Sequence, residues 1–378
     1  MLDFTIHTKV FFGENALDAL RTINIKKAFV VTDPFMVQSG AINNLTDILD
    51  DLQVPYSIFH DIVPDPPIEN VGDGVIAFLK ADPDTVIALG GGSAIDAAKA
   101  ISEFALKISG KSNAHCIAIP TTSGTGSEVT SFAVISDKQN NVKHPLVSDS
   151  LLPDIAILDP KLVITVPKIV TADTGMDVLT HAMEAYVSTK SNDFSDALAE
   201  KAIRLVCENL LCAYSDGTNL FAREKIHNAS CIAGMAFNNT SLGLNHGLAH
   251  SLGAQFKIAH GRINAILLPH IIKFNAQVKD HDSETYNDAA IKYANISKML
   301  NFPASNISEA VNSLVTAIIK LQKDMNMPTS LCEQGINKED LNLFKKEIAK
   351  NALLDATTKT NPRTPTINEV LQIIEDIY

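Results

Sequence analysis

The order of secondary-structure patterns along the chain limits the folds that it can adopt. Up to about residue 165, short apolar runs alternate with segments of helical periodicity, and TVIALGGGSAIDAAKAISEFAL combines a strand, a glycine turn and a helix in direct succession. After this point only helical patterns follow, as in TGMDVLTHAMEAYVS and SEAVNSLVTAIIKLQKDM. Alternating strands and helices imply right-handed crossovers and a mostly parallel sheet. We therefore predict an α/β domain over 1–165 and an all-helical domain over 166–378.

Size and composition exclude several classes of protein. A chain of 378 residues is long enough for two domains, and its net charge of −12 argues against a nucleic-acid surface. It contains no run of about 18 apolar residues that would span a membrane, and MLDFTIHTKVFFG does not resemble a secretory signal. The five cysteines form no CxxC pair, which fits a reducing cytoplasm and excludes the usual cysteine-ligated zinc sites. We expect a cytoplasmic protein whose partner is a small molecule.

Two glycine-rich loops in the first half are candidates for binding a dinucleotide. GGGSAIDAAK (90–99) follows a strand and opens a helix, so that its backbone can approach a diphosphate at the positive end of the helix. PTTSGTGSEVT (120–130) follows the strand HCIAI, which places it at the same edge of the sheet. The alternative is that both are polar turns, since the first lacks the GxGxxG spacing.

Asp33 ends the predicted strand KAFVVT, where a carboxylate can accept a hydrogen bond from a ribose 2′-hydroxyl and repel a 2′-phosphate. This placement favours NAD over NADP. The alternative is that Asp33 and Pro34 only begin a turn.

Five polar residues in the second half have the spacing of a metal site. Asp177 and His181 are four residues apart, His246 and His250 repeat that spacing, and His260 follows. Residues at i and i+4 project from one face of a helix. A set of one carboxylate and several imidazoles suits Fe(II) or Zn(II), and four of the five residues would complete a site.

Such a metal could lower the pKa of an alcohol or polarise an aldehyde, while a nicotinamide exchanges hydride with the substrate carbon. Because the candidate ligands and the candidate dinucleotide loops lie in different domains, we expect the active site in the cleft between them.

The chain resembles the iron-containing (group III) alcohol dehydrogenases. The resemblance extends from FFGENAL (11–17) to about NEVL (368–371) and is most specific in GGGSAIDAAKA, PTTSGTGSEVT, GMDVLTHAMEAYVS, HGLAHSLG and HGRINAILLP. It implies a dehydroquinate synthase-like architecture, in which an α/β dinucleotide domain precedes an all-helical metal domain. Within the family, VISDKQNNVKHPL, SDALAEKA and HNASCIAGMAF are most similar to the propanol dehydrogenases of propanediol utilisation.

The resemblance also implies roles for individual residues. The implied metal ligands are Asp177, His181, His246 and His260, and His250 is the implied proton carrier. The implied NAD contacts are Asp33, Asp65, Gly91, Gly92, Ser93, Thr121, Thr122, Thr125, Thr130 and Lys143. A homodimer or larger homo-oligomer is implied as well. Association with a bacterial microcompartment is a further expectation, although the N-terminus shows no amphipathic targeting extension.

Three departures from the family pattern concern the substrate pocket. Ala259 stands where the family often has proline, and Arg262 replaces a commonly apolar residue. Phe132 occupies a place where relatives can carry a polar contact, which favours a small apolar alcohol, such as 1-propanol, over a polyol.

The leading hypothesis is therefore an NAD- and Fe(II)-dependent dehydrogenase of a short-chain primary alcohol, acting as an aldehyde reductase. The alternatives are a 1,3-propanediol or lactaldehyde-type polyol dehydrogenase of the same fold, a metal-dependent hydrolase or lyase, and an inactive interaction protein. Binding of NADH separates the dehydrogenases from the last two.

Overall fold

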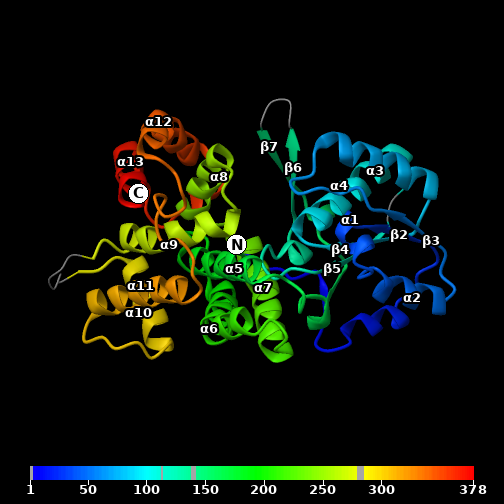
Figure 1. Ribbon diagram of the computed structural model, residues 1–378, viewed down its shortest axis with the longest axis horizontal. Helices are drawn as coiled ribbons and strands as arrows, with labels where there is room; N and C mark the ends of the chain where they lie inside the picture. The colour runs from blue at the N-terminus through cyan, green and yellow to red at the C-terminus, as the bar shows by residue number, and fades with distance from the viewer. Residues whose placement is uncertain (1–2, 112–113, 138–141, 279–284) are drawn as a thin grey trace. The chain divides into compact units, whose positions relative to one another are not determined.

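The computed structural model describes residues 3–111, 114–137, 142–278 and 285–378 (Figure 1). Internal contacts divide these residues into two compact units. The α/β unit comprises Thr5–Val166 and Thr218–Gly234. The helical unit comprises Pro167–Gly217, Met235–Tyr378 and the N-terminal residues through Phe4. A single boundary in the sequence does not describe this division, because Thr218–Gly234 lies within the second half of the chain.

The α/β unit is built on a six-stranded sheet in which every pair of neighbouring strands is parallel, which confirms the predicted fold class. The strand order is β1-β8-β5-β4-β2-β3. The strands are β1 (Lys9–Phe12), β2 (Ala28–Val31), β3 (Tyr56–Phe59), β4 (Thr85–Gly90), β5 (His115–Pro120) and β8 (Ile155–Leu158). Since the strands are parallel, the loops that follow β2, β4 and β5 all leave from one edge of the sheet.

Alternate residues of the central strands fill two separate cores. On β2, Phe29 and Val31 face one core, which also receives Val75 and Ile101 from helices, whereas Val30 faces the other. Figure 1 shows α3 (Ile68–Ala81) and α4 (Gly92–Ser109) on one side of this sheet and α2 (Asn43–Asp51) on the other. Strands that are buried on both faces carry continuous apolar runs, which is why the sequence pattern identified them.

The segment SFAVISD (131–137) contains a strand, but this strand does not join the main sheet. It is β6 (Phe132–Asp137), which pairs antiparallel with β7 (Val142–Val147) in a separate two-stranded ribbon. Two side chains of α4 bind its backbone, since the half-buried Asp96 accepts a hydrogen bond from Val134 N at 3.0 Å and the buried Lys99 donates to Phe132 O at 2.9 Å. These bonds use backbone groups that a further strand of the main sheet would need.

The remaining helices of the α/β unit are short. They are η1 (Ala16–Thr22), α1 (Pro34–Gln38), η2 (Ser127–Val129), η3 (Asp149–Leu151) and η4 (Pro160–Leu162). The first part of α7 (Leu220–Thr240) also belongs to this unit.

The helical unit contains only helices among the residues that the structure describes. They are the end of α7 together with α5 (Lys168–Val187), α6 (Asp193–Ser215), α8 (Leu244–Phe256), α9 (His260–Ala276), α10 (Asp288–Met299), α11 (Ile307–Asp324), α12 (Lys338–Leu354), η5 (Thr357–Thr360) and α13 (Ile367–Asp376). Apolar residues of α8, α9, α12 and α13, such as Leu248, Leu267, Ile348 and Ile374, form one core. No helix within the described ranges is both long and apolar enough to cross a membrane.

Candidate metal centre and dinucleotide-binding loops

Four side chains of the helical unit bring their ligand atoms together. Asp177 and His181 lie on α5, His246 lies on α8, and His260 is the first residue of α9. One oxygen or nitrogen atom from each residue lies within 4.8 Å of the others. Asp177 Oδ1 is 3.6 Å from Nε2 of His246 and 3.6 Å from Nε2 of His260.

These distances and this burial fit a divalent metal. Two ligand atoms bound to a tetrahedral ion at about 2.1 Å lie about 3.4 Å apart, close to the observed separations. The side chains of Asp177 and His246 are almost fully buried, whereas 42% of the His260 side chain is exposed. A carboxylate and imidazoles without thiolate suit iron or zinc. The residues present therefore fit the metal that the family resemblance implies.

Glu184 orients one of these histidines and was not identified from the sequence. It lies on α5 and is buried, and its Oε2 is 2.6 Å from Nδ1 of His246. An ionised carboxylate only accepts hydrogen bonds, so it favours a proton on Nδ1 and leaves Nε2 free to bind a metal. Glu184 lies three residues after His181 and seven after Asp177, and this helical spacing is the one signal that could have revealed it.

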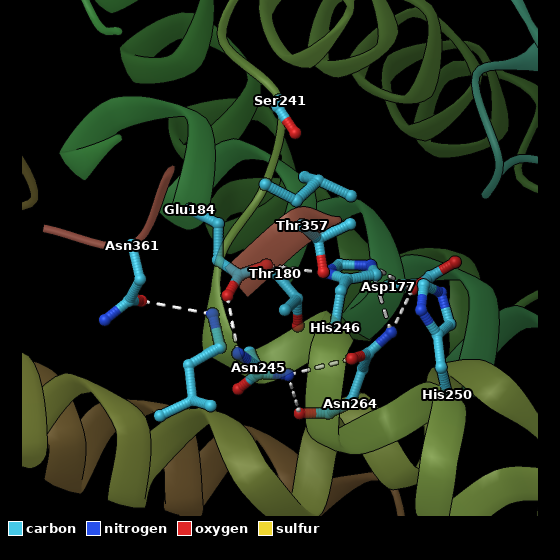
Figure 2. Close-up of polar contacts among 12 residues, drawn as sticks. Asp177, Thr180, Glu184, Ser241, Asn245, His246, His250, Asn264, Thr357 and Asn361 are labelled. Atoms are coloured by element: carbon cyan, nitrogen blue, oxygen red, sulfur yellow. Dashed lines mark hydrogen bonds and ion pairs between the residues drawn. The ribbon is translucent and has the colours of Figure 1, made fainter. Parts of the chain in front are cut away.

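An asparagine completes the surroundings of the cluster. Asn264 donates a hydrogen bond through Nδ2 to Asp177 Oδ1 at 2.7 Å, and the same nitrogen is 3.2 Å from His246 Nε2 and 3.1 Å from His260 Nε2. Asn245 donates to Asn264 Oδ1 at 2.8 Å and so determines which end of that amide faces the ligands (Figure 2). Three of the candidate ligand atoms thus lie around the amide nitrogen of Asn264.

The charges of the cluster shift the pKa values of its members. Burial raises the pKa of Asp177, but the neighbouring histidines outweigh burial and hold it well below its usual range. Burial opposes a charge on His246, yet hydrogen bonds to Asp177 and Glu184 raise its pKa. Burial lowers the pKa of His260. A metal ion bound at Nε2 of His246 would take the place of a proton beside Asp177, while Nδ1 would keep its proton toward Glu184.

His250 lies beside the cluster of Asp177, His181, His246 and His260 but outside it. It follows His246 by one turn of α8, and its ring stacks on that of His260 with 5.4 Å between ring centroids. Its Nδ1 atom is 2.8 Å from Asp355 Oδ2, and 43% of its side chain is exposed. The structure therefore places a half-exposed imidazole next to the predicted metal centre.

The start of α9 packs directly on α5. A Cβ atom on Gly261 would lie 2.0 Å from the carbonyl oxygen of Asp173, so that no side chain fits there. Arg262 donates to both carboxylate oxygens of Asp173, at 3.0 and 2.8 Å. This bidentate pair explains why a charged residue is accommodated beside His260, where the sequence comparison with the family suggested an apolar one.

In the α/β unit, the two glycine-rich loops meet as predicted. A Cβ atom on Gly91 would lie 3.3 Å from Thr122 Oγ1, and one on Gly92 would lie 2.7 Å from Thr125 Cγ2. Thr121 donates its backbone N–H to Gly90 O at 2.9 Å. Gly91 caps α4 without any side-chain hydrogen bond, and Ser93 lies in the first turn of that helix. These residues surround the N-terminus of an 18-residue helix, which is suited to bind a phosphate group.

The two predicted aspartates lie beside these loops. Asp33 Oδ1 accepts a hydrogen bond from Met36 N at 3.1 Å and caps α1, which is the turn role considered as the alternative. Its other oxygen faces Gly90, since a Cβ atom there would lie 3.4 Å from Asp33 Oδ2. Asp65 donates its backbone N–H to Ser93 Oγ at 3.3 Å. The backbone of Lys143 pairs with Ser136 in the ribbon, and its side chain lies outside the described part of the structure.

A buried lysine organises the second loop. Lys99 is 2% exposed and donates to Ser127 Oγ at 2.9 Å, to Thr130 O at 2.8 Å and to Thr130 Oγ1 at 3.3 Å. Burial lowers the pKa of this ammonium group to about 8. Thr130 is 2% exposed and therefore supports the loop from within it.

The same loop is held from the other side by α7. Ser123 Oγ is 2.9 Å from Nδ1 of His227, which is 1% exposed. Burial lowers the pKa of His227 from 6.5 to about 4, so that it is neutral at pH 7. Gly126 and Gly234 meet closely, because a Cβ atom on Gly126 would lie 2.8 Å from the Cα atom of Gly234. His227 thus helps to hold the second loop in place from the buried side.

The parallel α/β unit with its glycine-rich helix start, together with an aspartate–histidine cluster on helices, has the features expected of a metal-dependent dehydrogenase. Two family models match the chain, iron-containing alcohol dehydrogenase over residues 7–160 and the C-terminal part of the Fe-containing alcohol dehydrogenase family over residues 171–378. The chain belongs to the iron-containing alcohol dehydrogenase family, and it is an enzyme of that family.

Individual relatives agree with this assignment. The chain is 44% identical to the 1-propanol dehydrogenase PduQ of Citrobacter freundii, with 100% of both chains covered. It is also similar to a solved 1,3-propanediol oxidoreductase, with a TM-score of 0.91, 33% identity and 100% of both chains covered. A sulfoacetaldehyde reductase from Bifidobacterium kashiwanohense, solved in complex with NAD+, has a TM-score of 0.87 at 27% identity, covering 100% of this chain and 98% of its own.

Proposed function

We propose that the protein is an NAD(H)- and Fe(II)-dependent alcohol dehydrogenase. It interconverts a short-chain primary alcohol and its aldehyde, such as 1-propanol and propanal. The observation that carries the proposal is the convergence of Asp177, His181, His246 and His260, whose ligand atoms lie within 4.8 Å of one another. The chain also has two glycine-rich loops at one edge of its parallel sheet. These loops would bind the coenzyme that a nicotinamide-dependent reaction needs.

The four clustered residues would hold the metal, and a bound divalent ion supplies a Lewis acid that polarises the oxygen of the substrate. Glu184 and Asn264 keep the ligand atoms oriented before the metal arrives. His250 would transfer a proton to or from the substrate oxygen, because its ring is half-exposed beside the cluster. The donor set accepts zinc as well as iron, and the family favours iron.

The glycine-rich loops would bind the diphosphate of NAD. The free backbone N–H groups at the start of α4 are the expected phosphate contacts, and Asp33 is the expected contact of the ribose 2′-hydroxyl. If Asp33 rejects a 2′-phosphate, Asp33→Gly lowers the ratio of kcat/KM for NADH to that for NADPH by at least tenfold. An unchanged ratio would remove Asp33 from the coenzyme site.

Two observations bear on the choice of substrate. Phe132 is half-buried just after the threonine-rich loop and presents an apolar ring, and a 1-propanol dehydrogenase is 44% identical. Both favour an unsubstituted short-chain aldehyde. The similarity to 1,3-propanediol oxidoreductase supports a polyol dehydrogenase as the second candidate. Comparison of kcat/KM for propanal, 3-hydroxypropanal and lactaldehyde separates the two. The homo-oligomeric state and the association with a microcompartment stay predictions.

The decisive experiment measures NADH oxidation with propanal on anaerobically purified protein, before chelation, after chelation and after addition of Fe(II). We expect activity that disappears with the metal and returns with iron. Activity that survives complete removal of metal would refute the role of the cluster. An absence of turnover even with iron restored would favour a hydrolase or lyase, or an inactive interaction protein.

A further inference from the structure

The half-exposed His250 is tied to a carboxylate from a distant part of the chain. Asp355 is the residue that follows α12, and its Oδ2 lies 2.8 Å from Nδ1 of His250, 105 positions earlier. The bond uses Nδ1 only, so the other ring nitrogen, Nε2, stays available for a substrate. Neither the sequence patterns nor the family comparisons assign a role to Asp355.

The second carboxylate oxygen of Asp355 is also engaged. Oδ1 accepts hydrogen bonds from the backbone N–H of Thr357 at 2.9 Å and from its hydroxyl at 2.7 Å. Burial raises the pKa of Asp355, but the hydrogen bonds from His250 and Thr357 outweigh burial and hold it below its usual range. The carboxylate is therefore ionised and can only accept, which requires a proton on Nδ1 of His250.

The backbone around this pair is shaped for close approach. Gly247 lies three residues before His250 on α8, and a Cβ atom there would lie 2.2 Å from Thr358 Oγ1 and 3.0 Å from Ala352 O. Thr358 in turn donates its hydroxyl to Ala352 O at 2.7 Å. The segment after α12 is thus held directly on the helix that carries His250. Such contacts on both sides of Asp355 keep the carboxylate in place.

We propose that Asp355 is a positioning residue that holds His250 in the tautomer protonated at Nδ1, so that Nε2 exchanges the proton with the substrate oxygen. The inference rests on the proposed function, in which His250 is the proton carrier. During aldehyde reduction, a bound NADH would supply hydride to the carbonyl carbon, and a doubly protonated His250 would give its Nε2 proton to the oxygen. The products would be NAD+, the alcohol and a neutral His250 with its remaining proton on Nδ1, the tautomer that Asp355 stabilises.

Two substitutions distinguish this role from a merely structural one. In Asp355→Asn, the backbone N–H of Thr357 can only donate, so the amide oxygen faces Thr357 and the amide NH2 faces His250 Nδ1. That arrangement favours the wrong tautomer, with the proton on Nε2. Asp355→Ala removes both contacts and leaves the tautomer of His250 unconstrained. A structural role makes the alanine variant the worse of the two, whereas a tautomer-setting role makes the asparagine variant the worse.

The experiment compares kcat and KM of the wild type, both Asp355 variants and His250→Ala, all loaded with iron. Glu347→Gln serves as the control, because it makes the same carboxylate-to-amide change at an exposed position of α12. We expect Asp355→Asn to lower kcat about 100-fold or more, so that its kcat is lower than that of Asp355→Ala. The KM for NADH and the metal content should stay unchanged in both variants. Equal or higher kcat in Asp355→Asn than in Asp355→Ala would overturn the proposal.

A measurement on the unmodified chain tests the same point independently of folding in the variants. The ¹⁵N chemical shifts of His250 in zinc-loaded protein, assigned with His250→Ala, report which ring nitrogen carries the proton. We expect Nδ1–H in the wild type, and Nε2–H would overturn the role of Asp355 while wild-type turnover stays metal-dependent. Wild-type protein that shows no metal-dependent NADH oxidation would instead overturn the proposed function itself.

Discussion

Glu184→Gln tests whether the metal centre depends on a residue that never touches the metal. In the structure, Glu184 Oε1 accepts the backbone N–H of Asn245 at 2.7 Å, and Oε2 is 2.6 Å from Nδ1 of His246. Glutamine has the same shape, and its carbonyl oxygen has to stay on the backbone N–H of Asn245. Its NH2 group then faces Nδ1 of His246 and moves the proton to Nε2, the atom proposed to bind the metal.

The expected size of the effect follows from this geometry. Removal of a carboxylate behind a ligating histidine weakens metal binding by about 10- to 100-fold, or about 1.4 to 2.7 kcal/mol. Both hydrogen bonds here are short and almost fully buried, so we expect a value near the upper end. The assay is competition for Zn²⁺ between apo-protein and a fluorescent chelator at neutral pH.

The matched control is Glu208→Gln, which makes the same chemical change at an exposed position of α6 in the same unit. It should bind Zn²⁺ as tightly as the wild type. Circular dichroism of both apo-proteins separates a loss of metal affinity from a loss of fold. A folded Glu184→Gln protein with wild-type affinity for Zn²⁺ would refute the reasoning, because the proton position on His246 would then not matter.

Two further predictions concern stability. His227 has a folded pKa of about 4 against 6.5 in the unfolded chain, so the unfolded state binds more protons between these values and acidification destabilises the fold. Between pH 7 and pH 5 this residue should lower the free energy of unfolding by about 2 kcal/mol, and urea titrations of His227→Asn at both pH values should lack that contribution. Gly261→Ala places a Cβ atom 2.0 Å from Asp173 O and should cost about 1–3 kcal/mol and weaken metal binding, as measured by thermal unfolding and metal content. Gly253→Ala, whose Cβ atom would lie 3.4 Å from its nearest neighbour, should do neither, and equal behaviour of the two alanine variants would contradict this explanation.

The parts of the fold that could be predicted from the sequence are those that depend on local periodicity. Buried parallel strands produce continuous apolar runs, and the spacing of Asp177 and His181 predicts a shared helix face before any tertiary contact is known. The structure has both features, since every strand pair of the main sheet is parallel and α5 carries both residues.

The parts that escaped prediction depend on contacts between distant segments. Glu184 meets a histidine 62 positions away, and Asp355 meets one 105 positions away, so no local pattern connects either pair. The strand β6 has an ordinary strand sequence, and its pairing with β7 and its bonds to Asp96 and Lys99 on α4 are contacts with segments that its own sequence does not name. Sequence patterns identify such elements, whereas their partners are selected by tertiary structure.

The distribution of the ligands over three helices has a consequence for folding. A divalent ion held by Asp177, His181, His246 and His260 would cross-link α5, α8 and α9. An ion that binds the folded chain but not the unfolded one stabilises it by about 2.7 kcal/mol when its free concentration is 100 times its Kd. The helical unit would therefore unfold at a lower temperature when free metal is scarce, and protein made in iron-poor medium would be degraded sooner even before its activity is needed. Metal supply would then set the amount of enzyme as well as its turnover.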